Sequence, residues 1–287
     1  MTRSPRPGGL LRQQRELIQQ AGIQLKKGLG QHFLVDPGVV RGIVRLAALT
    51  QEDTVLEVGP GLGSLTLALA EAAGKTIALE KDEKLYHLLQ EQLAPYPQVE
   101  LIRADALFFD YASLEPGTKV VSNLPYAVAT PLLFRFLEQR GRICEMVLML
   151  QQEVADRLLA SPGSKTYGPL TVAVQLYCQV EKGFKVPPAA FWPRPKVHSM
   201  VVRFVLQTQP RVALTDEELF FKIVRASFAQ RRKTLLNNLR QAQHLGHDPG
   251  FWAEACRNVG IDPARRGETL SLEEFAALTH SVASQGR

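Results

Sequence analysis

The residues with the clearest chemical character follow an apolar stretch that ends at Asn123. There, Asn123-Leu124-Pro125-Tyr126 sets an amide, a rigid proline and an aromatic ring side by side. A turn accounts for the asparagine and the proline, because both residue types favour loop geometry. It does not account for the tyrosine, which indicates a role beyond the turn.

A glycine-rich segment, "LEVGPGLGSLT", contains Gly59, Gly61 and Gly63 between an apolar run and a helical pattern. Glycine lets the backbone turn sharply and approach a ligand closely beside a helix N-terminus. A dinucleotide fingerprint needs another glycine where this chain has Ser64, which disfavours pyrophosphate binding. The glycines alone leave two interpretations open, a nucleoside site and an ordinary tight turn.

Acidic residues end the next two predicted strands. Glu80 follows Gly59 by about 20 residues, the spacing at which an acid reaches ribose hydroxyls in doubly wound folds. Asp105 follows the third strand and can accept a hydrogen bond from an adenine amino group. A lone acid at a strand end is usually just solvated. Suitable groups at three successive strand ends predict a ligand site at that edge of the sheet.

This set of groups, without a phosphate-cradling loop, resembles the S-adenosylmethionine site of class I methyltransferases. "NLPY" is similar to the N/D-P-P-F/Y motif of members that methylate amino groups. The resemblance implies that the Asn123 side-chain oxygen and a backbone carbonyl near Pro125 accept hydrogen bonds from a target amino group, while Tyr126 stacks on its ring. Because an adenine N6 lone pair is delocalised into the ring, such acceptors favour the tetrahedral nitrogen of the transition state.

Three ordered motifs narrow the resemblance: "KKGLGQHFLVD", "NLPY" and "VPPAAFWPRPKVHS". Together they resemble the small-subunit ribosomal RNA adenine N6,N6-dimethyltransferase family over about residues 25–238. The large-subunit rRNA dimethyltransferases share this fold and chemistry. The stretches "FWPRPKVHS" and "QRRKTLLNNL" favour the small-subunit family.

The family resemblance implies both a cofactor site and a base-binding site. Phe191 is expected to stack on the adenine face opposite Tyr126, since a flipped base needs an apolar surface on each side. Ordinary hydrophobic packing is the alternative for Phe191. His32 stands where bacterial members usually have asparagine, and both side chains donate and accept hydrogen bonds. The implied cofactor residues are His32, Leu34, Gly59, Gly61, Glu80, Asp105 and Asn123.

Basic residues are the candidates for RNA contact. The net charge of +6 and the pI near 9.3 favour a polyanionic partner, although a merely basic protein has the same composition. Charge runs on helices are usually solvated faces, which is the alternative for each basic cluster. The candidate phosphate contacts are Lys26, Lys27, Arg225, Arg231, Arg232 and Lys233.

Composition excludes several other classes. No apolar run reaches the ~18 residues of a membrane span. Cys144, Cys178 and Cys256 lack the spacing of a zinc site or disulfide framework, which indicates a reducing, cytoplasmic compartment. The Arg-rich start lacks the apolar core of a secretory signal and is expected to be a basic arm with a short helix, or else a transit peptide. We expect the protein to be a monomer. We also expect it to need no metal, because methyl transfer from a sulfonium requires none.

Strands and helices alternate from Asp36 to about Leu206. Asp36 and Pro37 suit the cap and first position of a helix. The alternation predicts an α/β fold, a Rossmann-like class I methyltransferase sheet with helices on both faces. Predicted strands span residues 54–59, 75–80, 99–104, 119–123, 145–150, 181–186 and 200–206, with helices at 64–74 and 83–93.

After residue 208 the pattern becomes entirely helical. Thr215 with Glu218 and Ser271 with Glu274 are candidate capping boxes at helix starts. We therefore expect three parts: a basic arm at 1–24, a methyltransferase domain at 25–208 and a small all-α rRNA-binding domain at 209–287.

The sequence and the resemblance together predict dimethylation of N6 of two adjacent adenosines near the 3′ end of small-subunit (16S) rRNA, with S-adenosylmethionine as cofactor and the assembling small ribosomal subunit as partner. Two rivals remain: large-subunit rRNA dimethylation, and a non-catalytic assembly or transcription factor that keeps the fold as an RNA-binding module. Intact Asn123, Pro125, Tyr126 and Glu80 argue against the second rival, because binding alone requires no acceptors for an amine.

Overall fold

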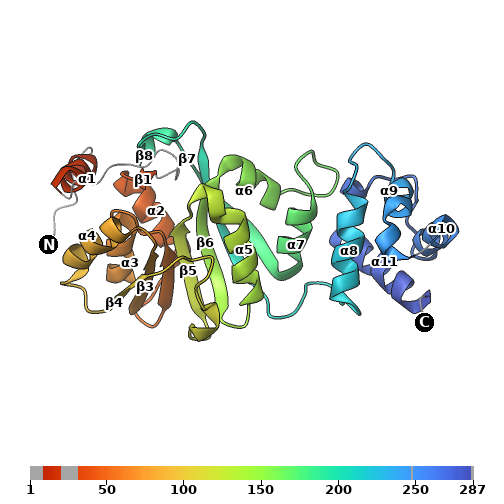
Figure 1. Cartoon of the computed structure of the whole chain (residues 1–287), viewed down its shortest axis with the longest axis horizontal. Helices are drawn as coiled ribbons and strands as arrows, with labels where there is room; N and C mark the ends of the chain where they lie inside the picture. The colour runs from red at the N-terminus through yellow and green to blue at the C-terminus, as the bar shows by residue number, and fades with distance from the viewer. Residues whose placement is uncertain (1–8, 21–31, 247, 286–287) are drawn as a thin grey trace. The chain divides into compact units, whose positions relative to one another are not determined.

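The structure, a computed structural model, describes residues 9–20, 32–246 and 248–285 (Figure 1). Contacts between residues divide the chain into two compact units. The first unit holds the described residues up to Ala155 together with Val180–Leu206. The second holds Asp156–Gln179 and the described residues from Gln207 onward.

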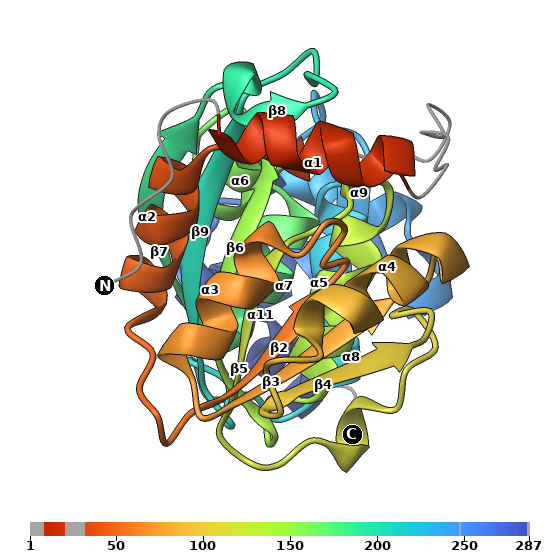
Figure 2. The same ribbon diagram turned by 90° about the vertical axis from the view of Figure 1, so that its left-hand side faces the viewer.

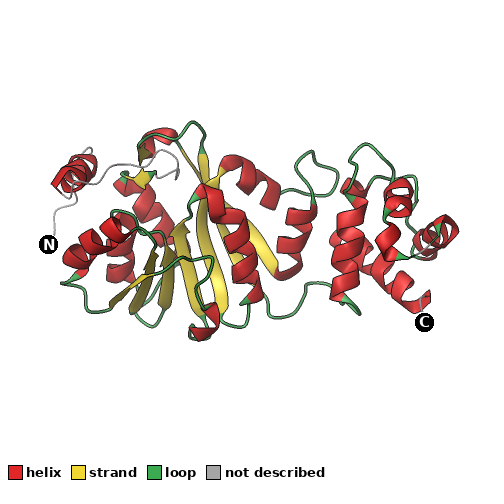
Figure 3. Cartoon of the chain, in the orientation of Figure 1, coloured by secondary structure: helices red, strands yellow, loops and turns green. Residues whose placement is uncertain are grey.

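Strands form one large sheet and one small one (Figure 3). The strands are β1 (Phe33–Leu34), β2 (Thr54–Val58), β3 (Lys75–Glu80), β4 (Val99–Arg103), β5 (Thr118–Asn123), β6 (Ile143–Gln151), β7 (Cys178–Val186), β8 (Phe191–Trp192) and β9 (Ser199–Leu206). The large sheet has the order β4-β3-β2-β5-β6-β9-β7, in which β2 to β6 pair in parallel and β9 runs antiparallel to β6. The small sheet pairs β1 with β8.

Helices cover both faces of the large sheet. The helices are α1 (Gly9–Gln20), α2 (Pro37–Ala47), α3 (Ser64–Ala72), α4 (Glu83–Leu93), α5 (Ala129–Glu138), α6 (Gln152–Leu158), α7 (Pro169–Tyr177), α8 (Glu217–Ser227), α9 (Leu235–Gln241), α10 (Pro249–Asn258) and α11 (Leu272–Gln285). Helices α2, α3 and α4 lie on one face of the sheet and α5 on the other (Figures 1 and 2). The predicted Rossmann-like α/β fold is thereby confirmed. Across the described ranges, no helix has the length and apolar character needed to cross a membrane.

The N-terminal arm contains the expected short helix, α1. Ile18 of this helix is buried against Phe33 and Leu85 of the first unit. Lys26 and Lys27, which the sequence suggests as RNA contacts, lie outside the described residues.

Local sequence signals explain where the elements of the first unit begin. The Asp36 carboxylate accepts hydrogen bonds from the backbone N–H groups of Gly38 (2.7 Å) and Val39 (3.2 Å), so it caps α2 as predicted. Between α2 and the sheet, apolar side chains such as Ile43 and Val121 are almost fully buried. Burial of each such side chain contributes about 1.5–3 kcal/mol, and this layer holds the strand ends in place.

Capping in the second unit agrees with the prediction at one helix and differs at another. Before α11, the Ser271 N–H donates to the Glu274 carboxylate (2.8 Å) and the Glu274 N–H donates to the Ser271 hydroxyl (3.2 Å), which confirms the capping box. At α8 the predicted box at Thr215 is wrong. Asp216, one residue later, is the cap, because its carboxylate accepts the Leu219 N–H at 2.8 Å.

The two units do not follow the chain as simply as the sequence suggests. They change at Gln207, close to the predicted start of the helical domain, but residues 156–179 group with the C-terminal helices. Within that unit, the Tyr167 hydroxyl donates to the Leu270 carbonyl (3.0 Å) and the Gly163 N–H donates to the Glu268 carbonyl (2.7 Å). The three-part division of the chain stays a prediction.

Candidate functional site

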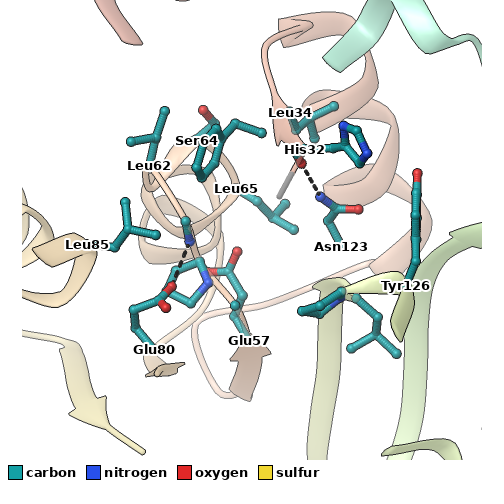
Figure 4. A pocket seen from close by; sticks show the side chains of 16 residues that line it. His32, Leu34, Glu57, Leu62, Ser64, Leu65, Glu80, Leu85, Asn123 and Tyr126 are labelled. Carbon is teal, nitrogen blue, oxygen red and sulfur yellow. Dashed lines mark hydrogen bonds between the residues drawn. The ribbon is translucent and has the colours of Figure 1, made fainter. Parts of the chain in front are cut away.

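A cavity lies at the carboxyl ends of β2, β3 and β5 (Figure 4). Ligands bind at this edge in open α/β sheets because the loops that follow the parallel strands meet there. Most of the predicted cofactor and catalytic residues line this one cavity: His32, Leu34, Gly59, Gly61, Glu80, Asn123, Pro125 and Tyr126.

The glycine turn after β2 forms one wall of the cavity. Gly59 and Gly61 have φ values of +70° and +61°, which favour glycine. A Cβ atom on Gly61 would lie 2.9 Å from the Phe33 ring, and one on Gly59 would lie 3.3 Å from Pro125. Both glycines are therefore required by backbone conformation and by the close approach of the opposite wall.

Glu80 lies at the end of β3 and is 6% exposed. Its Oε1 accepts the Asp82 N–H (2.8 Å) and its Oε2 accepts the Gly61 N–H (3.3 Å). Burial raises the pKa of Glu80, and the backbone N–H groups oppose that rise. A carboxylate offers about four acceptor positions, so Glu80 keeps acceptors for the two hydroxyls of a ribose.

Glu57 is a functional candidate that the sequence reasoning did not assign. It projects into the cavity from β2 at 2% exposure, and its Oε2 has no hydrogen-bond partner among the described residues. Burial raises the pKa of Glu57 to about 8; the nearby Thr66 hydroxyl opposes this rise and the Glu80 charge adds to it. Because Glu57 also lines the cavity, its carboxyl group suits a ligand donor such as an ammonium group. A glutamate inside the apolar run "VLEVG" was the available signal.

Asn123 and Tyr126 lie on the opposite side of the cavity from Glu57 and Glu80 (Figure 4). The Asn123 Nδ2 donates to the His32 carbonyl at 3.4 Å, which leaves the side-chain oxygen on the Tyr126 side (Figure 4). The His32 and Tyr126 ring centroids are 5.9 Å apart. The amide oxygen faces the side of the cavity on which Tyr126 lies, an arrangement that suits an amine on a planar base (Figure 4).

Asp105 and Phe191 are not among the residues that line the cavity. Asp105 pairs with Lys81 (2.7 Å), which holds the pKa of Asp105 below its usual range and keeps it an ionised acceptor at the end of β4. Phe191 is 2% exposed, pairs with Leu34 across the small sheet and packs in the core of the first unit. Its burial favours the packing alternative, and a stacking role for Phe191 stays a prediction.

The predicted RNA contacts of the second unit differ in their surroundings. Arg225 and Arg232 are exposed, and Lys233 is half-buried. Arg231 forms an ion pair with Glu268 and also donates to a backbone carbonyl. Arg232 is therefore a better candidate for a phosphate contact than Arg231, whose guanidinium already has protein partners.

Asn238 fixes the turn that carries Arg231 and Arg232. Its Nδ2 donates to the carbonyls of Ser227 (2.9 Å) and Gln230 (3.1 Å), and its Oδ1 accepts the Gln230 N–H. Asn238 is 2% exposed, so these bonds replace water contacts that the buried amide lacks.

Possible metal ligands in the part of the chain that the structure describes are His, Cys, Asp and Glu side chains. The three cysteines are free, and no group of three or more His, Cys, Asp or Glu side chains there could hold a metal ion.

A Rossmann-like sheet with a glycine turn, a buried acid at the next strand end and the NLPY motif at a neighbouring strand end defines a class I methyltransferase. The chain belongs to the ribosomal RNA adenine dimethylase family, whose model matches residues 22–281. The predicted family is therefore confirmed.

Individual relatives agree with this assignment. The chain is 46% identical over 277 residues to a ribosomal RNA small subunit methyltransferase A of Moorella thermoacetica, covering 93% of this chain and 95% of the relative. The protein of the same name from Bacillus mycoides is 44% identical, with 93% and 94% covered. Among solved structures, a dimethyladenosine transferase from Plasmodium falciparum matches with a TM-score of 0.75 and 26% identity, covering 89% of this chain and 98% of that one. The 23S rRNA methyltransferase ErmE matches with a TM-score of 0.69 and 25% identity, with 88% and 99% covered.

Proposed function

We propose that this enzyme transfers methyl groups from S-adenosylmethionine to N6 of two adjacent adenosines near the 3′ end of small-subunit ribosomal RNA, during assembly of that subunit. The observation that carries the proposal is the orientation of the Asn123 amide, whose nitrogen donates to the His32 carbonyl so that its oxygen is directed toward the Tyr126 side of the cavity. An oxygen acceptor next to a stacking ring is what an adenine amino group requires.

The choice of the small subunit is supported by the names of the relatives. Both relatives at 44–46% identity are called ribosomal RNA small subunit methyltransferase A, whereas the 23S rRNA methyltransferase is 25% identical. The large-subunit rival therefore has the weaker support. The two adjacent adenosines follow from the resemblance of the three sequence motifs.

Several residues of the cavity fit S-adenosylmethionine. Glu80 would hold the ribose hydroxyls, and the Glu57 carboxyl group would accept a hydrogen bond from the ammonium group of the methionine tail. Asp105, at the end of β4, would accept from the adenine amino group of the cofactor. When bound, the cofactor supplies an electrophilic methyl group.

The remaining residues act on the target base. The Asn123 side-chain oxygen would accept one N6–H bond, which draws the nitrogen toward tetrahedral geometry. The Pro125 carbonyl already accepts the Val128 N–H (3.1 Å), so we assign the second acceptor to the carbonyl of Leu124. Tyr126 would stack on the base, and the walls would exclude water. Alignment and desolvation then suffice without a strong base, because an alkylated amine is acidic.

Methylation of separated ribosomal subunits tests the proposal. Undermethylated small and large subunits are incubated with tritiated S-adenosylmethionine, and the labelled nucleotides are mapped. Label in N6,N6-dimethyladenosine of small-subunit rRNA is expected, and fully methylated small subunits should take up none. Label confined to large-subunit rRNA would favour that rival, and cofactor binding without any transfer would favour a non-catalytic factor.

The remaining predictions concern the RNA contacts, the location, the oligomeric state and the metal requirement of the enzyme. Contact of the basic turn at Arg231 to Lys233 with rRNA is part of this proposal. The cytoplasmic location, the monomeric state and the lack of a metal requirement stay predictions.

A further inference from the structure

The hydroxyl group of Tyr126 has a partner that the chemistry of the site does not explain. It lies 2.6 Å from the Oγ of Ser199, the first residue of β9. Ser199 is fully buried, and its hydroxyl has no access to water that could replace Tyr126. Loss of the Tyr126 hydroxyl would leave the buried Ser199 hydroxyl unpaired, which is costly.

The sheet fixes Ser199 relative to Asn123. Strand β6 pairs with β9 so that Gln151 lies opposite Ser199, and it pairs with β5 so that Met149 lies opposite Asn123. A single strand thus sets both the amide that would bind the amine and the hydroxyl that binds Tyr126. The contact is a link between two motifs more than seventy residues apart in sequence, "NLPY" and "KVHS".

The same segment holds the second ring of this wall. The His32 Nδ1 lies 2.7 Å from the Pro193 carbonyl oxygen, and the His32 ring is tilted by 37° against Tyr126. Residues 193–199 therefore contact both rings, one through a carbonyl and one through a hydroxyl.

From these contacts we propose that Ser199 is a positioning residue for methyl transfer: its hydroxyl fixes the Tyr126 ring so that a stacked adenine brings N6 to the Asn123 amide oxygen. Without the hydrogen bond to Ser199, the Tyr126 ring samples more orientations. A base stacked on the ring then also samples more orientations. Reaction rates fall steeply when reacting groups are misplaced by even 1 Å. The inference rests on the proposed function, in which Tyr126 stacks on the target base.

A double-mutant cycle tests the role of Ser199. Ser199→Ala, Tyr126→Phe and the double variant are compared with the wild type in single-turnover methylation, at saturating cofactor and small subunits. Each single substitution should slow methyl transfer by about 3- to 10-fold, the effect of one lost hydrogen bond. The double variant should be no slower than the slower single variant, since both remove the same contact. Cofactor affinity should not change.

Thr118→Val is the matched structural control. The Thr118 hydroxyl is buried and donates to the Glu115 carbonyl (2.7 Å) at the far end of β5 from Asn123. Its loss should lower the unfolding temperature about as much as Ser199→Ala but leave the methylation rate unchanged.

Three results would overturn the role of Ser199: wild-type rates for Ser199→Ala, multiplied losses in the double variant, or an equal slowing by Thr118→Val. If Ser199→Ala does not fold, the test rests on Tyr126→Phe alone. Methyl transfer by Tyr126→Phe at the wild-type rate would then refute the role of Ser199. A wild-type enzyme that methylates no small-subunit adenosine would instead refute the proposed function.

Discussion

The carboxyl group of Glu57 should make cofactor binding depend on pH. Glu57 is a buried residue that lines the cavity, and burial raises its pKa to about 8. At neutral pH the free enzyme therefore carries mostly protonated Glu57. If the ammonium group of S-adenosylmethionine binds the ionised carboxylate, binding must release the Glu57 proton.

The size of the effect follows from the pKa. Below pH 8 each pH unit should weaken binding by up to about tenfold, or about 1.4 kcal/mol. Above about pH 8 the amino group of the ligand loses its own proton, so affinity should be highest near pH 8. Glu57→Gln cannot titrate and should bind with little dependence on pH over this range.

Calorimetry at pH 6, 7 and 8 measures both the affinity and the proton release, the latter from two buffers with different ionisation enthalpies. The expected result for the wild type is tighter binding from pH 6 to 8, with release of nearly one proton at pH 6. Equal affinities at pH 6 and 8 without proton release would refute the assignment of Glu57 to the ammonium group.

The same shift has a consequence for folding. The folded-state pKa of Glu57 lies above its ordinary value of 4.5, so its contribution to stability is complete below pH 4.5 and is lost as the pH rises toward 8. The stability of Glu57→Gln relative to the wild type should therefore rise by up to about 5 kcal/mol between pH 4.5 and 8. Urea denaturation of both proteins at several pH values measures this difference, and a constant difference would contradict the raised pKa.

Two further predictions concern the cofactor and the RNA. Glu80→Ala should weaken S-adenosylmethionine binding by about 1.5–3 kcal/mol, the range for charge-assisted hydrogen bonds, and unchanged affinity in calorimetry would remove Glu80 from the site. Replacing Arg232 and Lys233 by Gln should lower the slope of the logarithm of subunit affinity against the logarithm of salt concentration by up to about 0.9 per lost contact. Arg231→Gln should mainly lower the unfolding temperature, because it leaves Glu268 unpaired. An unchanged salt slope for the Arg232 and Lys233 variant would indicate that these two residues belong to a solvated face and do not contact phosphates.

Much of the site is predictable because the carboxyl ends of parallel strands meet at one edge of the sheet. Gly59, Glu80 and Asn123 each end or follow a strand, and parallel pairing brings those ends to one edge. The family motifs then indicate what each residue would contact. The apolar alternation likewise predicts every strand of the large sheet.

Contacts between distant segments were not predictable from local patterns. In the sequence, Arg231 is one of a run of basic residues. In the structure it forms an ion pair with Glu268, which is 37 residues away along the chain. The pairing of Tyr126 with Ser199 and the burial of Phe191 arise from the packing of β9 and β8 against distant strands. Such contacts leave no periodic signal in the sequence, because each depends on a single pair of residues.

The single-turnover rate of Asn123→Ala tests most directly whether this cavity holds an adenine amine. The assay uses undermethylated small subunits at saturating S-adenosylmethionine, with Asn258→Ala, an exposed asparagine in the second unit, as the matched control. Removal of one transition-state acceptor should slow methyl transfer at saturating cofactor by about 10²–10³-fold, by analogy with loss of an oxyanion-hole donor, while subunit binding is retained. Methylation by Asn123→Ala at the rate of the wild type and the control would contradict the assignment of Asn123 to the target amine.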